Sequence, residues 1–150
     1  MKRMFLLSAA ASMWLFLFSG TLPVKTANNS APADTGRYDI VNCINEFTPA
    51  RVESTKAGYQ YWFADRKFAD GKTLKLSVVR PHEATHAPHH HAEDEFFFVL
   101  QGKAEFDLDG RTRVVGPYTS LYCPPNSEHG IRNVGDTELR YLVVKKYGTK

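Results

Sequence analysis

Histidine is concentrated in one short stretch of this chain. Five of its six histidines fall within the ten residues from His82 to His91, three acidic residues follow at positions 93–95, and the sixth histidine, His129, stands apart. Neutral imidazole and carboxylate are the ordinary protein ligands for divalent transition metals. A packed core has no use for such a cluster, because each buried imidazole needs a hydrogen-bond partner. The stretch therefore predicts a metal site.

Side-chain parity narrows the candidate ligands. Residues two apart on a strand point the same way, so His89 and His91 can face one point while the histidine between them faces away. Glu93 and Glu95 share this parity, so parity leaves both carboxylates open. His129 follows after a predicted hairpin and a return strand, which could bring it beside the first cluster in a closed antiparallel barrel.

Three imidazoles and one carboxylate suit Mn, Fe, Co, Ni, Cu or Zn, and a six-coordinate ion would keep two positions for water or substrate. The competing interpretation is a solvated, metal-binding loop without an ordered site, or a metal buffer that holds several ions per chain. The other three histidines are expected in loops or at the mouth of a pocket: His82, His86 and His90.

The elements that must position these residues are strands. From about Tyr38 onward, short β-like runs alternate with turn residues, and no window holds a helical stripe. This pattern predicts an all-β barrel or sandwich. Strands are expected at 59–63, 74–79, 95–101, 103–108, 111–115, 120–123, 130–134 and 139–145.

Two of these strands allow finer predictions. Residues 103–108 alternate strictly, and a three-residue loop after them would pair Phe106 with Val114, whereas a two-residue loop would pair it with Arg113; the hydrophobic pattern favours the longer loop. Residues 96–100 are apolar on both faces, so their outer face needs a cover. That cover would be a second sheet, the N-terminal segment or another subunit, which makes a homodimer one hypothesis.

The N-terminal residues predict export. Lys2 and Arg3 precede an apolar run over 4–18 that is shorter than the roughly 20 residues of a membrane-spanning helix. We therefore expect residues 1–21 to be a signal peptide, with a cleavage site as late as residue 27 and an uncleaved anchor as the alternative. A flexible linker is expected at 22–37 and one β-domain at 38–150. The mature protein would be periplasmic or secreted, without a stable membrane span.

The net charge and the two cysteines give limited information on partners and on disulfides. The formal net charge is +3, but the expected leader carries Lys2 and Arg3 and no acidic residue, so the mature domain is nearly neutral. The basic balance thus gives no support for nucleic acid as a partner. Cys43 and Cys123 fit no metal or redox motif; they could form a disulfide after export, or each could be a small buried apolar residue.

Two motifs contain the candidate ligands: His89-x-His91-x3-Glu95-x6-Gly102 and Pro124-x-Asn126-x2-His129-x3-Asn133. Together they resemble the two motifs of the cupins. The resemblance implies a single cupin β-barrel (a jelly roll, or double-stranded β-helix) of the small, quercetin-dioxygenase-like type, with Glu95 rather than Glu93 as the carboxylate ligand. The implied metal ligands are His89, His91, Glu95 and His129.

The sequence departs from the family pattern at three glycine positions and at none of the four ligands. These positions hold Glu83, Tyr118 and Asn126. Asn tolerates the left-handed backbone region that the last of these turns uses, so that departure is mild.

The resemblance implies a metal-dependent enzyme of dioxygenase type acting on a small organic substrate, with phenols among the candidates. Glu95 would be its catalytic residue, leaving the metal to accept a substrate proton. Two alternatives stand beside it, because the cupin fold does not fix function. One is a non-catalytic metal-binding cupin that holds a small ligand or sugar, and the other is an isomerase or lyase.

Overall fold

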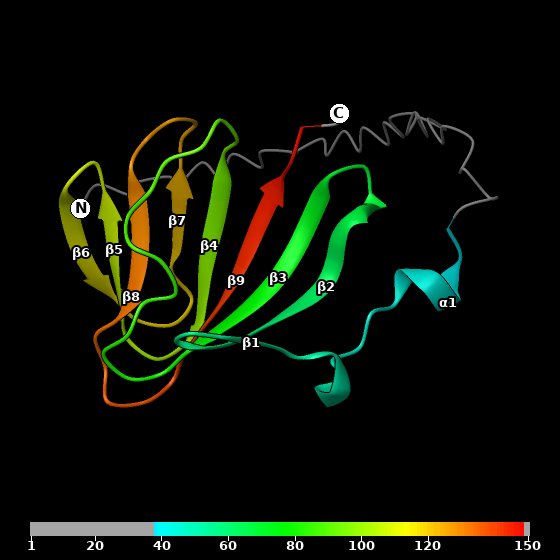
Figure 1. Cartoon of the computed structure of the whole chain (residues 1–150), viewed down its shortest axis with the longest axis horizontal. Helices are drawn as coiled ribbons and strands as arrows, with labels where there is room; N and C mark the ends of the chain where they lie inside the picture. The colour runs from blue at the N-terminus through cyan, green and yellow to red at the C-terminus, as the bar shows by residue number, and fades with distance from the viewer. Residues whose placement is uncertain (1–37, 149–150) are drawn as a thin grey trace, which may run out of the picture. The chain divides into compact units, whose positions relative to one another are not determined.

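Two antiparallel sheets make up the described part of the chain, residues 38–148 of a computed structural model (Figure 1). The predicted signal peptide and linker lie outside these residues. The larger sheet has the order β1 (Glu53–Thr55), β2 (Gly58–Ala69), β3 (Lys72–Val79), β9 (Leu139–Lys146), β4 (Glu95–Gln101) and β7 (Ser120–Cys123). The smaller sheet has the order β6 (Arg111–Val115), β5 (Ala104–Leu108) and β8 (His129–Asn133).

The hydrophobic core contains side chains of both sheets. Phe97 and Val99 of β4 and Phe106 of β5 are buried, and the rings of Phe97 and Phe106 stack with centroids 6.2 Å apart. Alternate burial along β9 shows the pattern of a strand with one face on the core. The prediction of an all-β barrel is confirmed, and β3 to β9 lie close to the predicted ranges. β1 was not predicted, and β2 extends to Ala69, beyond the predicted 59–63.

Two short helices precede the strands and were not predicted. They are α1 (Ile40–Cys43), which Asp39 and Asn42 close in a capping box, and the 3-10 helix η1 (Pro49–Arg51). The segment between them covers β2: Phe47 packs on Tyr61 with ring centroids 4.8 Å apart, and the Tyr61 hydroxyl donates a hydrogen bond to the Glu46 carbonyl. Within the described residues, no helix is long and apolar enough to cross a membrane.

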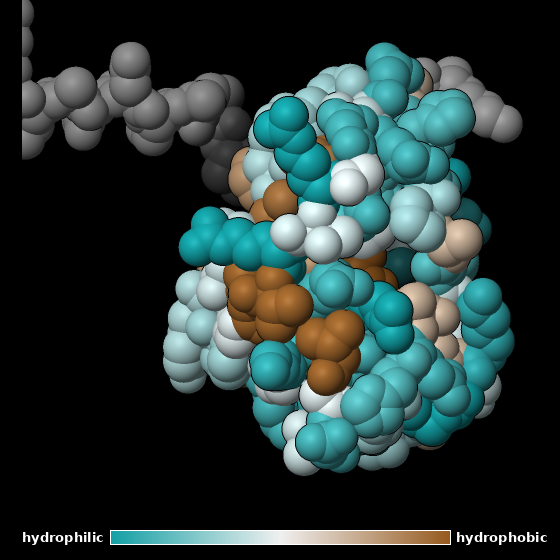
Figure 2. Space-filling view, turned by 90° about the vertical axis from the view of Figure 1, so that its left-hand side faces the viewer, coloured by the Kyte–Doolittle hydropathy of each residue, from teal (hydrophilic) through white to brown (hydrophobic). Residues whose placement is uncertain are grey.

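The predicted register of the β5–β6 hairpin is wrong. Phe106 pairs with Arg113, and the loop has two residues, Asp109 and Gly110, both with positive φ (52° and 75°) as a type I′ turn requires. β6 lies at the edge of its sheet, and Val114 is half exposed there, so its hydrophobic pattern holds little information about register. Figure 2 shows this side of the molecule as largely hydrophilic, with a small apolar group.

The outer face of β4 stays open to solvent within the described residues. Phe96 and Leu100 are 45% and 39% exposed, and Phe96 pairs with the exposed Tyr122 of β7 and Val144 of β9. The expectation that this face needs a cover thus remains a prediction.

The two cysteines do not form a disulfide. Cys43 lies exposed in α1, and Cys123 is fully buried in β7 next to β4. Burial raises the pKa of the Cys123 thiol to about 12, so at neutral pH this thiol is protonated and behaves as a small apolar group.

Asn133 joins three parts of the fold. Its side-chain nitrogen donates to the carbonyls of Val79 (3.0 Å) and Thr137 (2.7 Å), and its side-chain oxygen accepts from the amide of Gly135 (2.9 Å). The end of β3, the end of β8 and the turn before β9 therefore meet at one fully buried amide.

We expect Asn133→Leu to lower the free energy of unfolding by on the order of 3 kcal/mol, because it removes the partners of two carbonyls and one amide while keeping the branching of the side chain. Denaturant unfolding measures this loss. Asn126→Gly is the matched control: Asn126 is exposed with φ 64°, which glycine adopts without strain, so its stability should not fall. Equal stability of Asn133→Leu and the control would contradict the assignment.

We expect Ellman's reagent to label one thiol per native chain at pH 8 and two in guanidinium chloride. The exposed Cys43 reacts, whereas Cys123 is both shielded and protonated at that pH. A Cys43→Ser chain should show no native labelling. No reaction in guanidinium before reduction would reveal a disulfide and contradict the structure.

Candidate metal centre

Three separate pieces of the chain supply the four predicted ligands. His89 and His91 lie in the segment between β3 and β4, Glu95 opens β4, and His129 opens β8. The first and last pieces are joined by an isolated antiparallel bridge, in which the His89 amide donates to the His129 carbonyl (3.0 Å) and the His129 amide donates to the His89 carbonyl (2.9 Å). This bridge places the imidazoles of the two residues beside each other.

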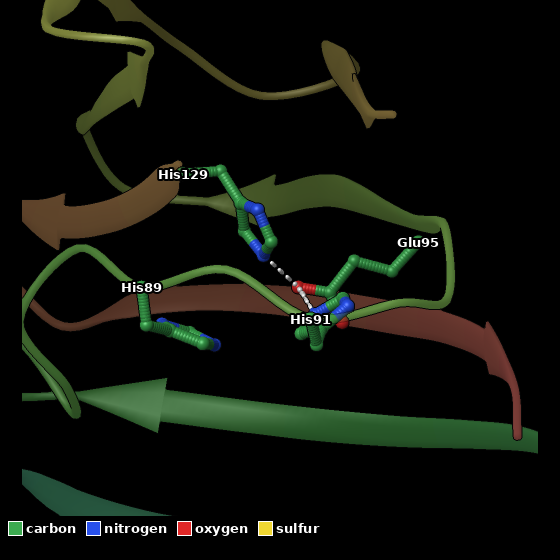
Figure 3. Close-up of side chains that lie close together, drawn as sticks. All are labelled: His89, His91, Glu95 and His129. Atoms are coloured by element: carbon green, nitrogen blue, oxygen red, sulfur yellow. Dashed lines mark hydrogen bonds and ion pairs between the residues drawn. The ribbon is translucent and has the colours of Figure 1, made fainter. Parts of the chain in front are cut away.

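The four side chains converge on one space (Figure 3). One potential ligand atom from each of His89, His91, Glu95 and His129 lies within 4.8 Å of all the others. Two atoms that bind one ion at about 2.1 Å lie at most about 4.2 Å apart, so a contraction of several tenths of an ångström would suffice for coordination. The structure thus brings together the four residues that the sequence predicted.

Backbone carbonyls fix the tautomer of all three imidazoles. The Nδ1 atoms of His89, His91 and His129 lie 3.2, 2.6 and 2.9 Å from the carbonyl oxygens of Ala87, Glu93 and Ser127. A carbonyl only accepts, so each Nδ1 carries the proton and donates it. Each Nε2 is then left with a lone pair, which is the arrangement of a metal-binding histidine with its outer hydrogen bond in place.

The contacts inside the cluster call for a cation. Nε2 of His129 lies 3.0 Å from Oε1 of Glu95, although both atoms are acceptors in these protonation states; a proton or a metal ion must lie between them. Nε2 of His91 is buried without a hydrogen-bond partner and lies 3.6 Å from the same oxygen. These residues therefore fit a divalent transition metal, since bound metal would satisfy every one of these atoms.

The two carboxylates that parity left open have different roles. Glu95 is buried and directs Oε1 at the imidazoles, while its Oε2 lies 4.0 Å from Nζ of Lys145. Glu93 is not part of the cluster: its Oε2 lies 3.6 Å from the same ammonium, and its carbonyl accepts from His91. The Lys145 ammonium therefore lies near both carboxylates, and the surroundings of Glu95 are charged rather than apolar.

The other histidines lie outside the cluster. His82 makes an exposed contact of 3.1 Å with Asp136, and His90 is exposed. His86 lines the cavity beside the cluster, with its ring 5.8 Å from that of His89. Burial lowers the pKa of both His86 and His89, so these two imidazoles are neutral at neutral pH.

Residues that the sequence interpretation missed line the same cavity. They come from β3 and β9, and the most informative are Lys75, Ser77, Tyr141 and Lys145. A signal for them was present, because Lys145 shares the parity of the buried Tyr141 and Val143 along β9.

Two of the three glycine positions at which the motif departs keep the backbone that glycine favours. Tyr118 has φ 60° and Asn126 has φ 64°, both in the left-handed region. The expectation that Asn126 preserves its turn is confirmed, and its amide donates to the His91 carbonyl (2.8 Å), which ties this turn to the ligand segment.

Comparison with known proteins agrees with this architecture. Residues 75–145 match the family described as Cupin domain. The chain is 38% identical over 69 residues to the polyketide synthase CurC of Streptomyces cyaneus, and 35% identical over 72 residues to the H2HPP isomerase of Bacillus subtilis. These matches cover 46% and 47% of this chain but only 45% and 30% of the two relatives, so the chain spans less than half the length of either.

A solved structure shows the same fold. The polyketide cyclase RemF from Streptomyces resistomycificus aligns with a TM-score of 0.58 and 23% identity, covering 69% of this chain and 79% of that protein. The family match spans the strands that carry or surround the histidine–glutamate cluster, from β3 to β9. Residues 75–145 thus match the Cupin domain family, and the described part of the chain has the fold of a small single-domain cupin.

Proposed function

We propose that this protein is a metal-dependent enzyme that acts on a small organic substrate. The observation that carries the proposal is the set of three Nε2 lone pairs and one carboxylate oxygen that meet beside a cavity of about 160 Å³. A bound transition metal would polarise a substrate oxygen there as a Lewis acid.

The chain's own groups supply proton transfer and water exclusion. Nζ of Lys145 lies 4.0 Å from Oε2 of Glu95, while Oε1 faces the imidazoles, and Glu95 remains our candidate for the catalytic base. The neutral His86 at the cavity wall is a second group that could accept a proton. Burial raises the pKa of Tyr141, which therefore stays a neutral phenol. Phe97 and Val143 exclude water from the inner wall.

Two reaction classes call for separate tests. The resemblance to quercetin-dioxygenase-like cupins supports a dioxygenase acting on a phenolic substrate. The similarity to an isomerase supports the second candidate, an isomerase or lyase reaction without O2. Redox-active Fe, Mn, Ni, Co or Cu suits the first class, whereas Zn suits only the second.

Export and self-association complete the proposal. The apolar run behind Lys2 and Arg3 supports a periplasmic or secreted location, which fractionation of producing cells would test. The exposed apolar face around Phe96 and Leu100 supports a homodimer, which a monomeric mass in solution would contradict.

We expect the purified chain, stripped with a chelator and reloaded, to bind one divalent ion. Elemental analysis should give one equivalent per chain, and His129→Ala should lower the affinity at least 100-fold because it removes a ligand from a preorganised set. Since His129 is fully buried, circular dichroism must show that the variant folds. Glu95→Gln keeps the shape of the side chain but removes its negative charge, so it should also lower the metal affinity.

His90→Ala is the matched control for this experiment. His90 belongs to the same histidine-rich segment but is exposed and lies outside the cluster, so the variant should keep one equivalent. Several ions per chain, or equal losses in His90→Ala and His129→Ala, would favour a metal-binding loop over an ordered centre.

We expect the metal-loaded chain to convert at least one member of a panel of phenols and small organic acids, and the chelated chain to convert none. Oxygen-electrode and product measurements, made with and without O2, separate the two reaction classes: a dioxygenase consumes O2 with substrate, whereas an isomerase works equally well without it. Binding of panel members by the loaded chain without conversion would favour the non-catalytic alternative.

A further inference from the structure

The cavity beside the metal cluster has room for a small ligand. Its volume is about 160 Å³, and a cavity of about this size accommodates benzene in an unrelated protein. His89, His91 and Glu95 form one wall, so a ligand inside it lies next to the cluster. The remaining walls decide which ligand chemistry fits.

Two lysines project from the inner faces of the sheet into this cavity. Lys145 pairs with Glu95 across β9 and β4, and Lys75 of β3 pairs with Val143, whose other neighbour is the buried Phe97. Lysine is rarely fully buried without a charged partner. Lys145 is buried and Lys75 is partly buried, so the surroundings of both ammonium groups matter.

Lys145 lies within ion-pair distance of two carboxylates, and Lys75 of none among the described residues. Nζ of Lys145 lies 3.6 Å from Glu93 and 4.0 Å from Glu95, whereas no carboxylate of the described residues lies within 4.0 Å of Nζ of Lys75. The Lys75 ammonium instead lies 5.1 Å from the centroid of the Trp62 ring. Burial, and after it the charge of Lys145, lower the pKa of Lys75, while the more distant carboxylates of Glu95 and Glu53 act in the opposite direction.

The charges of the site leave room for an anion. Two ammonium groups, those of Lys75 and Lys145, face three carboxylates: Glu93 and Glu95 lie within 4.0 Å of Lys145, and Glu95 and Glu53 attract Lys75 from farther away. A divalent ion would add two positive charges and leave the site with more positive than negative charge. A low-dielectric cavity with that excess favours a negatively charged ligand.

We propose that the cavity selects a small organic anion, such as a carboxylate, with Lys75 as the residue that recognises its charge. This proposal rests on the proposed metal-dependent function, because the ion supplies the excess charge. Ser77 and Thr85, which hydrogen-bond the Tyr141 hydroxyl, form a polar wall without charge, so charge selection depends on Lys75 and the ion. Lys75 is a specificity residue and not a metal ligand.

The test compares acids with amides of the same shape. The full-length chain is loaded with zinc, which has no redox chemistry, and titrated with benzoate, benzamide, propionate and propionamide by calorimetry. We expect each acid to bind at least 10-fold more tightly than its amide. In Lys75→Met the acids should weaken roughly 10- to 100-fold while the amides change little, as expected for a lost hydrogen bond to a charged group.

Lys72→Met is the matched control, because Lys72 lies on the same strand but is exposed to solvent. It should keep the full preference for acids. In a Trp14→Phe background, where Trp62 is the remaining tryptophan, benzoate should also change the fluorescence, since Lys75 lies over the Trp62 ring. This optical signal should disappear in Lys75→Met.

Zinc content separates the two proposals. One equivalent of zinc with equal binding of acids and amides, or with no binding of either acid, would overturn anion selection and leave the metal centre intact. Anion selection by Lys75 is likewise overturned if Lys75→Met and Lys72→Met behave alike. A wild-type chain that retains no zinc would overturn the metal centre and, with it, the anion proposal.

Discussion

The pair of backbone hydrogen bonds between His89 and His129 is the contact on which the candidate site depends. The segment that carries His89 and His91 forms no named strand, so this bridge sets its position along β8. The amide of Asn126 fixes the same segment a second time, at the carbonyl of His91. A shift of one residue would turn His90 inward and His89 outward, because side-chain direction alternates along an extended chain.

The same backbone also sets the electrostatics of the site. Carbonyl groups hold the Nδ1 protons of His91 and His129, so their Nε2 lone pairs point at the Glu95 carboxylate and at each other. Acceptors that face acceptors raise the free energy of the folded chain unless a proton or cation lies between them. A metal ion bound only by the folded state could take the place of a proton here and would stabilise that state.

The strands and the ligands could be predicted from the sequence for one physical reason. A strand with one buried face has a hydrophobic pattern that repeats every two residues. This pattern predicted β4 and β5 and placed His89 and His91 on the same side. It failed where that constraint is weak or ambiguous. β6 is an exposed edge strand, so its apolar residues misled the register, and α1 and η1 are too short to show a helical period. Lys75 and Lys145 were missed because lysine usually points to solvent.

The registers of β3, β9 and β4 arrange the interior in successive rows. The first row holds Thr73, Lys145 and Glu95, the second Lys75, Val143 and Phe97, and the third Ser77, Tyr141 and Val99. Charge is thus confined to the two rows at the metal end, and hydroxyl and apolar groups form the third. The charged group of a ligand would not be stabilised deeper than the second row, because it would lose its hydration there without meeting a group of opposite charge. The depth of the cavity therefore limits the size of the ligand. The position of the lysines requires the charged group of the ligand to lie at the metal end.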